Sequence, residues 1–233
     1  MSSRSIHQAS AVGPHVERHS SAHVDHRQRT PVLSPVFPTP SPPILGNTQF
    51  WVDPASLPNS GDASEIAGNV PEYVKQLNNN TFASYGVGDE ECFGYRVGRV
   101  VKFVEVNMQR SEEKRGRMEA TTVAEVRVSK AMLNGAGMLH GGCIAYLIDN
   151  CCSTPLVVLG LMQKANGVGV TQAMNIFFHS PASMGACLRI MSTSVTMGSR
   201  IMTSRCEIFD KDTGRAIASA FLNKMQPTIQ SRL

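Results

Sequence analysis

The chain has 233 residues, of which 42% are hydrophobic, so it is long enough to bury a sizeable core in one or two domains. Its formal net charge of +4 is mild and is shared between an N-terminal segment and the rest, without a basic stripe, which argues against a nucleic-acid-binding protein. The chain has six cysteines, three of them in one apolar run. This placement indicates that they are small core side chains and not a disulfide framework.

Residues 1–60 are predicted to be a disordered extension and linker. The first 45 residues hold five of the seven histidines, and six prolines lie between Pro31 and Pro43, with few aliphatic side chains and no periodicity. These histidines lack a regular ligand spacing, so no metal is predicted, and no cofactor is implied. No stretch approaches the roughly 20 apolar residues of a membrane span, and the N-terminus lacks the apolar centre of a secretory signal.

Residues 61–226 are predicted to form the folded domain. A linker is expected over Trp51–Pro71, followed by a short helix over Glu72–Asn80 that a run of asparagines ends. A valine-rich strand is predicted within Arg96–Asn107, and an alternating, half-exposed strand over Arg117–Val128. The charged run between these two strands predicts a solvated hairpin turn.

The apolar run Cys143–Leu159 predicts a long helix that is hydrophobic on every side, as in a helix packed inside a core. Pro155 is expected to kink or end this helix, because proline removes a backbone donor and clashes with the preceding turn. The strands predicted after it are Val168–Phe178, Cys187–Thr196, Arg200–Phe209 and Arg215–Lys224. One long helix with five or six antiparallel strands predicts an α+β fold in which the sheet wraps around the helix.

A glycine-rich polar loop leads into this helix and ends in His140-Gly141-Gly142. Backbone N–H groups at a helix N-terminus bind developing oxyanions, so the loop is a candidate active site. Asp149 is the one acid in the apolar run, where a carboxylate is costly unless it is paired or used in catalysis. A structural role for Asp149, as a cap or a hydrogen-bond acceptor, is the alternative.

Four segments together carry a resemblance to a known family: Asn134, His140–Gly142, Leu147–Asn150 and Met174–Ala182. They resemble the hotdog-fold acyl-CoA thioesterases of the phenylacetate-degradation and thioesterase-superfamily-member-2 type, over residues 96–225. The resemblance implies the hotdog fold, an antiparallel sheet of five or six strands wrapped around one long central helix. It also implies a thioester hydrolase.

By the same resemblance, catalytic roles fall on five residues. Gly141 and His140 would polarise the thioester carbonyl, and Asn134 would hold the carbonyl or the water. Asp149 would act as a general base on water or attack directly as a nucleophile, and the hydroxyl of Thr171 would orient the water. Structural roles stay open for His140 as a loop cap, Asn134 as a turn residue and Thr171 as an ordinary strand residue.

Coenzyme A phosphates need cationic and backbone donors, which the resemblance places after a strand, at a hairpin and near the end of the domain. The candidate substrate-binding residues are His179, Ser180, Pro181, Met197, Gly198, Ser199, Arg200 and Lys224. Arg200 is the first choice because a guanidinium fits phosphate in a bidentate manner, and a solvated hairpin charge is the alternative. The acyl chain is expected to lie against Tyr146, Leu147 and Phe178.

Gly141 and Asp149 lie eight residues apart in the sequence. On one helix this spacing separates them by about 12 Å, so they cannot both reach one carbonyl from the same chain. The two groups must then come from different subunits across a two-fold interface, which predicts a homodimer. The resemblance implies that the dimer commonly doubles to a tetramer.

The predicted function is hydrolysis of fatty acyl-CoA to free acid and coenzyme A. Two alternatives stay open: a hydratase or dehydratase of the same fold, and a non-catalytic acyl-CoA-binding protein. The tail 227–233 ends in Ser231-Arg232-Leu233, which resembles a peroxisomal address read by an import receptor. Arginines and serines near the N-terminus leave the mitochondrion or the cytoplasm as alternative locations.

Overall fold

The computed structural model describes residues 52–112 and 115–226. Predictions for residues 1–51 and for the tail 227–233, including the histidines and the address at Ser231–Leu233, lie outside this part. Its helices are α1 (Glu72–Phe82), α2 (Tyr95–Gly98) and α3 (Gly141–Gln163), with short helical turns η1 (Pro54–Ser56), η2 (Ala83–Val87) and η3 (Lys130–Met132). Its strands are β1 (Lys102–Ser111), β2 (Arg117–Arg127), β3 (Val170–Phe178), β4 (Cys187–Met197), β5 (Ile201–Asp210) and β6 (Ala216–Met225).

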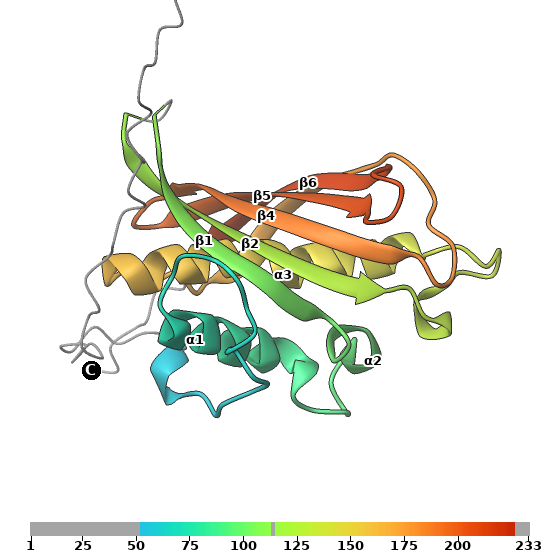
Figure 1. The fold of residues 1–233 in the computed structure, drawn as a ribbon, viewed down its shortest axis with the longest axis horizontal. Coiled ribbons are helices and arrows are strands. Elements are labelled where there is room, and N and C mark those ends of the chain that lie inside the picture. The colour runs from blue at the N-terminus through green and yellow to red at the C-terminus, as the bar shows by residue number, and fades with distance from the viewer. Residues whose placement is uncertain (1–51, 113–114, 227–233) are drawn as a thin grey trace, which may run out of the picture. The chain divides into compact units, whose positions relative to one another are not determined.

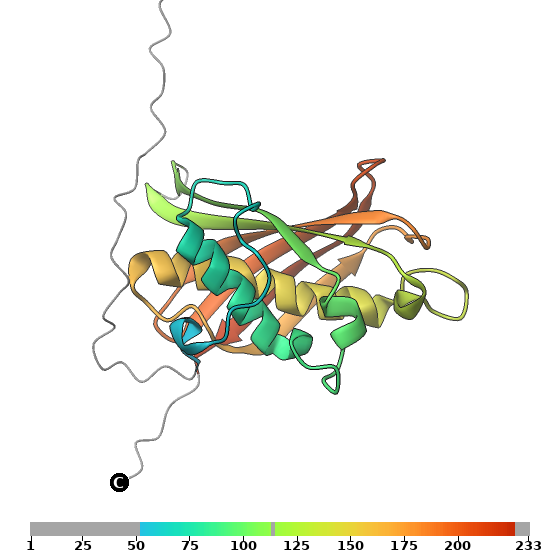
Figure 2. The ribbon, with the colours of Figure 1, turned by 60° about the horizontal axis from the view of Figure 1, so that its bottom comes forward.

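The strands form one antiparallel sheet in the order β1-β2-β4-β5-β6-β3. α3 lies along one face of this sheet, mainly against β2, β4 and β5, and α1 packs on its other side (Figure 1). α2 lies on the same side of α3 as α1 (Figure 2). A long helix enclosed by an antiparallel sheet is the predicted α+β hotdog fold, and this prediction is confirmed.

α3 is buried over most of its length, because the sheet covers one side and α1 the other. Ile148, Cys152 and Leu156 are fully buried along it. Among the described residues, α3 is the one helix that is long and apolar enough to cross a membrane. The expectation that no apolar stretch approaches the length of a membrane span is therefore wrong. Because 78% of the most apolar 18-residue stretch of α3 is buried inside the fold, its apolar side chains form the core of the domain.

α3 continues past Pro155 to Gln163, so the proline does not end the helix, which was one of the two predicted outcomes. Pro155 lacks the N–H that would donate to the carbonyl oxygen of Cys151. Thr154 replaces that donor, because its Oγ1 donates to the same oxygen at 2.7 Å. The same hydroxyl lies 2.7 Å from Oγ1 of Thr122 on β2, which ties this part of the helix to the sheet.

The segment before α1 is part of the domain, so the prediction of a linker over Trp51–Pro71 is wrong for its second half. Ala63, Ile66 and Val70 are at most 5% exposed and belong to the main hydrophobic core. Ala67 pairs with Glu105 of β1 and exchanges backbone hydrogen bonds with β1. The segment therefore covers the free edge of β1. An uncovered strand edge can pair with other chains, and this segment prevents such pairing.

The valine-rich stretch Arg96–Asn107 is divided between two elements. Its first residues belong to α2, and β1 begins only at Lys102. The hairpin turn predicted after it is confirmed, since β1 and β2 pair antiparallel up to Ser111 and Arg117.

The opposite edge of the sheet is β3, which pairs with no further strand among the described residues. Met174, Phe177 and Phe178 on this strand are 38%, 55% and 57% exposed. An apolar edge strand with no cover in the described residues is an association surface by its chemistry.

Candidate active site

The loop that leads into α3 is held by its own side chains. Asn134 Oδ1 accepts hydrogen bonds from the N–H groups of Ala136 and Met138, at 3.0 and 3.1 Å. His140 is the N-cap of α3, and its Nδ1 accepts from the N–H of Gly142 at 2.8 Å. Because Nδ1 is the acceptor, the proton of the neutral imidazole is assigned to Nε2, which leaves a donor for a substrate. Both side chains therefore have the structural role that was left open for them.

The first turn of α3 leaves one backbone donor free. The N–H groups of Cys143 and Ile144 donate to the carbonyl oxygen of His140, at 2.9 and 3.1 Å. The N–H of Gly142 is taken by the His140 ring, whereas that of Gly141 has no acceptor among residues 52–112 and 115–226. The Gly141 N–H lies at the positive end of the helix dipole, a position that suits an oxygen gaining negative charge.

Asp149 and Thr171 lie side by side, as the family resemblance implied. The hydroxyl of Thr171, on β3, donates to Asp149 Oδ1, on α3, at 2.6 Å. Asp149 is half-buried and Thr171 is exposed, so water can reach the pair. No group in the described part of the chain is hydrogen-bonded to Asp149 Oδ2, which leaves this oxygen to accept a proton.

Within one chain, the free N–H and the acid remain apart. A Cβ added at Gly141 would lie 3.6 Å from the ring of Phe178, which places the helix start at one end of β3. Asp149 is bonded to Thr171 at the other end of the same strand. The structure therefore does not bring Gly141 and Asp149 together in a single subunit.

A groove follows α3 from its N-terminus to Asp149. Its outer wall is the segment between α1 and β1, where Phe93 packs edge-on against Tyr146 with ring centroids 5.8 Å apart. Gly94 gives the Tyr146 ring its space, because a Cβ there would collide with the ring. Two adjoining hollows make up the groove and share Cys92, Phe93, Gly142 and Tyr146. The apolar lining suits an acyl chain.

Of the three residues expected along the acyl chain, only Tyr146 lines this groove. Leu147 is 1% exposed and points into the core, so that prediction is wrong. Phe178 lies on the open edge strand, beside Gly141.

Comparison with known proteins finds similarity over the residues that form the candidate site. A sequence model of the thioesterase superfamily matches residues 136–217, a range that includes His140, Asp149 and Thr171. Residues 136–217 of this chain are therefore similar to the thioesterase superfamily. Acyl-coenzyme A thioesterase 13 from Homo sapiens and from Pongo abelii are each 31% identical to it over 96 residues, which make up 41% of this chain and 66% of each relative.

The crystal structure of zebra fish thioesterase superfamily member 2 has a TM-score of 0.52 against this chain, at 21% sequence identity. The similarity covers 64% of this chain and 97% of the zebra fish chain. It shows that the two proteins share the hotdog fold.

Lys224 lies in the interior of the folded domain, which corrects its assignment to coenzyme A phosphates. Its side chain points inward from β6 and is 4% exposed, and its Nζ donates to Oγ of Ser153 on α3 at 2.8 Å. Burial lowers the pKa of Lys224 to about 8, against the opposing effect of the Asp149 charge. An ammonium group so enclosed does not reach a phosphate in solvent. The alternation of Lys224 with the buried Ala220 and Leu222 is the sequence signal that indicates the inward orientation.

The other candidate phosphate contacts form two groups at opposite ends of the sheet. His179, Ser180 and Pro181 follow the end of β3, where His179 Nε2 lies 2.8 Å from Oγ of Ser219. The second group is the β4–β5 turn with its flanking residue: Met197, Gly198, Ser199 and Arg200. Strand register places this turn beside the beginning of β3, so one chain does not bring the two groups together.

No cysteine in the groove has the character of a nucleophile. Burial raises the pKa of the Cys143 thiol to about 11, so the thiol is protonated near neutral pH. Residues 52–112 and 115–226 contain no group of three or more histidine, cysteine or acidic side chains that could hold a metal ion.

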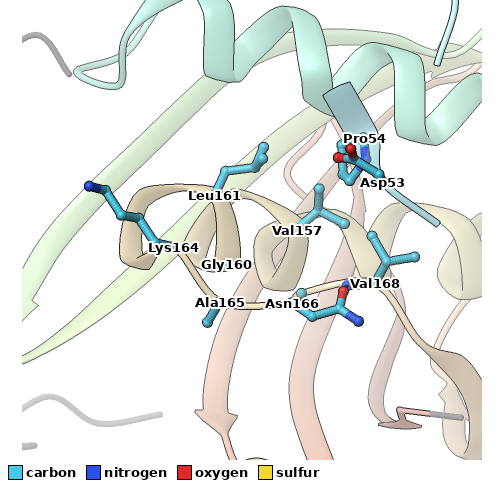
Figure 3. A pocket seen from close by; sticks show the side chains of 10 residues that line it. Asp53, Pro54, Val157, Gly160, Leu161, Lys164, Ala165, Asn166 and Val168 are labelled. Carbon is cyan, nitrogen blue, oxygen red and sulfur yellow. The ribbon is translucent and has the colours of Figure 1, made fainter. Parts of the chain in front are cut away.

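A separate small pocket lies at the C-terminal end of α3 (Figure 3). Asp53 and Pro54 face Val157 and Leu161 across it. None of the predicted catalytic residues lines this pocket, so it is distinct from the groove.

Proposed function

We propose that this chain is an acyl-CoA thioesterase, which hydrolyses fatty acyl-CoA to the free acid and coenzyme A. The observation that carries the proposal is the Asp149 carboxylate, which accepts from Thr171 at 2.6 Å and opens onto an apolar groove. The Gly141 N–H, which has no acceptor in the described residues, supplies the second group that thioester hydrolysis needs. The relatives named acyl-coenzyme A thioesterase 13 support this substrate class.

The reaction adds water to the thioester carbon, breaks the carbon–sulfur bond and releases the coenzyme A thiol. Asp149 Oδ2 would take a proton from the attacking water while Thr171 holds the other oxygen in place. Direct attack by Asp149, through an anhydride that water then opens, is the second route. On both routes negative charge collects on the thioester oxygen, where the N–H of Gly141 and the Nε2–H of His140 would stabilise it.

The proposed mechanism requires a homodimer, because Gly141 and Asp149 of one chain are separated by about 12 Å along α3. The open, apolar edge of β3 supports this requirement, since pairing with a second copy would cover it. Assembly of the dimer into a tetramer stays a prediction.

The register of β3 suggests how two copies would complete the site. Two β3 strands paired antiparallel around Met174 and Asn175 would bring Thr171 of one copy opposite Phe178 of the second. Because Thr171 holds Asp149 and Phe178 lies beside Gly141, the acid of one copy would then face the N–H of the second. Two-fold symmetry would produce two such sites in each dimer.

The two alternative functions make different demands on the site. A hydratase or dehydratase needs a histidine and an acid on one motif of one chain, whereas His140 and Asp149 of one chain lie at opposite ends of the groove and could meet only across two copies. A non-catalytic binder needs the groove without a functional Asp149. Substitution of Asp149 therefore separates the thioesterase from the binder.

The experiment is to measure release of free coenzyme A thiol from a panel of acyl-CoA esters. Asp149→Asn should lower turnover by about 100-fold or more while the protein still binds coenzyme A in calorimetry. Asp212→Asn, which changes an exposed turn acid, is the matched control and should remain as active as the wild type. A folded wild type that binds coenzyme A but hydrolyses no ester would establish the binder, and full activity of Asp149→Asn would exclude the mechanism.

A further inference from the structure

Lys224 places an ammonium group directly behind the candidate acid. Its Nζ donates to Oγ of Ser153 at 2.8 Å, and the same Oγ donates to the backbone oxygen of Asp149 at 2.6 Å. A continuous hydrogen-bonded path therefore joins the β6 lysine to the turn of α3 that carries the carboxylate. At 4% exposure, Lys224 has little contact with solvent.

The groups around Lys224 leave Asp149 as its natural counter-charge. The titratable groups that face it are Asp149 and Cys152 on α3 and Tyr85 on η2, whose ring centroid lies 5.1 Å from Nζ. The strand neighbours of Lys224, Thr171 on β3 and Met202 on β5, do not titrate. Among these groups, only an aspartate is ordinarily ionised at neutral pH.

Burying the Lys224 ammonium alone would be costly. An ammonium group in the interior loses its hydration, and an opposite charge nearby offsets part of this cost. Ser153 and the ring of Tyr85 supply polar contacts to the ammonium, but neither supplies a charge. The negative charge of the Asp149 carboxylate therefore favours the ionised form of the Lys224 ammonium.

We propose that Lys224 is a positioning residue that, through Ser153 and its own positive charge, holds the Asp149 turn of α3 in place for catalysis. This inference rests on the proposed role of Asp149 in thioester hydrolysis. Lys224 acts through its charge, so its contribution is full while the ammonium is protonated and disappears as the pH rises above the pKa of about 8.

The electrostatic coupling between Asp149 and Lys224 can be measured without an activity assay. Wild type labelled with 13C at lysine Cε is titrated by NMR, and the Lys224 signal is assigned from its absence in Lys224→Arg. The expected midpoint lies near pH 8 in the wild type and falls in Asp149→Asn, because the carboxylate that raises the pKa of Lys224 is then gone. Glu207→Gln, which changes an exposed acid of β5, should leave the midpoint in place. An unchanged midpoint in Asp149→Asn would overturn the inference.

Kinetics then test whether the charge serves catalysis. The ratio of wild-type to Lys224→Met kcat should be tenfold or more at pH 6 and approach one above pH 9, where the wild-type lysine is neutral as well. Lys102→Met, which changes an exposed lysine of β1, should match the wild type at every pH. If the ratio of wild-type to Lys224→Met kcat did not vary with pH, Lys224 would have only a structural role. Absence of wild-type turnover would instead refute the proposed function, and the NMR titration would still decide the coupling.

Discussion

The backbone N–H of Gly141 can be removed almost without other change. Proline is well tolerated at the first position of a helix, and His140 before it has the extended backbone that precedes a proline, with φ −70 and ψ 134. Gly141→Pro should therefore fold normally and lower kcat by about 100- to 1000-fold, the effect of losing one oxyanion donor. Steady-state release of coenzyme A measures this loss.

Gly141→Ala is the matched control for that prediction. It retains the N–H, and its Cβ would meet the Phe178 ring at an ordinary contact distance of 3.6 Å. We expect it to keep most of the wild-type activity. Equal rates for the proline and alanine variants would exclude the Gly141 N–H from the site.

Lys224 should reduce stability at neutral pH while it supports catalysis. The pKa of Lys224 is lowered from its ordinary value of 10.5 to about 8, so folding disfavours the charged form. The resulting penalty is full below pH 8, shrinks between pH 8 and 10.5 and is absent above. Lys224→Met should therefore be more stable than the wild type by about 1–4 kcal/mol at pH 7 in urea unfolding. A gain that persists unchanged above pH 10.5 would contradict this explanation.

Single residues differ in how well the sequence predicts them. Asp149 could be identified because it is the one acid in an apolar run, and Thr171 because the family resemblance pointed to its position. Lys224 was misplaced because a positive charge near the end of the domain suggests a surface phosphate contact, although its strand position points inward. Tyr85 and Phe93 precede the resembling motifs, and only the folded structure brings them to the groove.

At the scale of elements, Thr154 is what allows α3 to pass through Pro155. Thr154→Val would leave the buried Cys151 carbonyl without its hydroxyl donor and would remove the partner of Thr122. We expect a loss of about 1–3 kcal/mol in the free energy of unfolding. Urea denaturation measures this loss, and Thr196→Val, at an exposed position of β4, is the control that should change little.

The same prediction has an internal check. Combining Thr154→Val with Pro155→Ala restores a backbone N–H that can donate to the Cys151 carbonyl. The double variant should recover part of the lost stability. If Thr154→Val alone were as stable as the wild type, the hydroxyl would not be compensating for the proline.

The elements themselves were largely predictable, since strong periodicity and turn residues define both the long helix and the strands. The wrong predictions concern segments in which the apolar residues show no clear periodicity. Residues 63–70 read as a linker because their few apolar side chains show no periodicity, yet they fill the core once β1 is beside them. The division of Arg96–Asn107 into α2 and β1 was missed because a short run of apolar residues fits a short helix as well as a strand.

At the scale of the whole molecule, two copies of the chain are the proposed catalytic unit. The spacing of Gly141 and Asp149 on one helix predicted a dimer. The structure supports it with an apolar β3 that no described residue covers, and whose two ends lie beside Asp149 and Gly141. The sequence could not indicate which surface would pair, because only the order of strands in the sheet makes β3 an edge.

The most direct test of this account mixes two inactive variants. Asp149→Asn and Gly141→Pro are each purified, then unfolded and refolded together in equal amounts, and coenzyme A release is measured. In a mixed dimer, the intact Gly141 of one subunit faces the intact Asp149 of the other, so one of two sites is restored. Since half of the dimers are mixed, we predict recovery of about a quarter of wild-type activity. Activity no higher than that of the separate variants, with mixed dimers present, would show that each site is built within one chain.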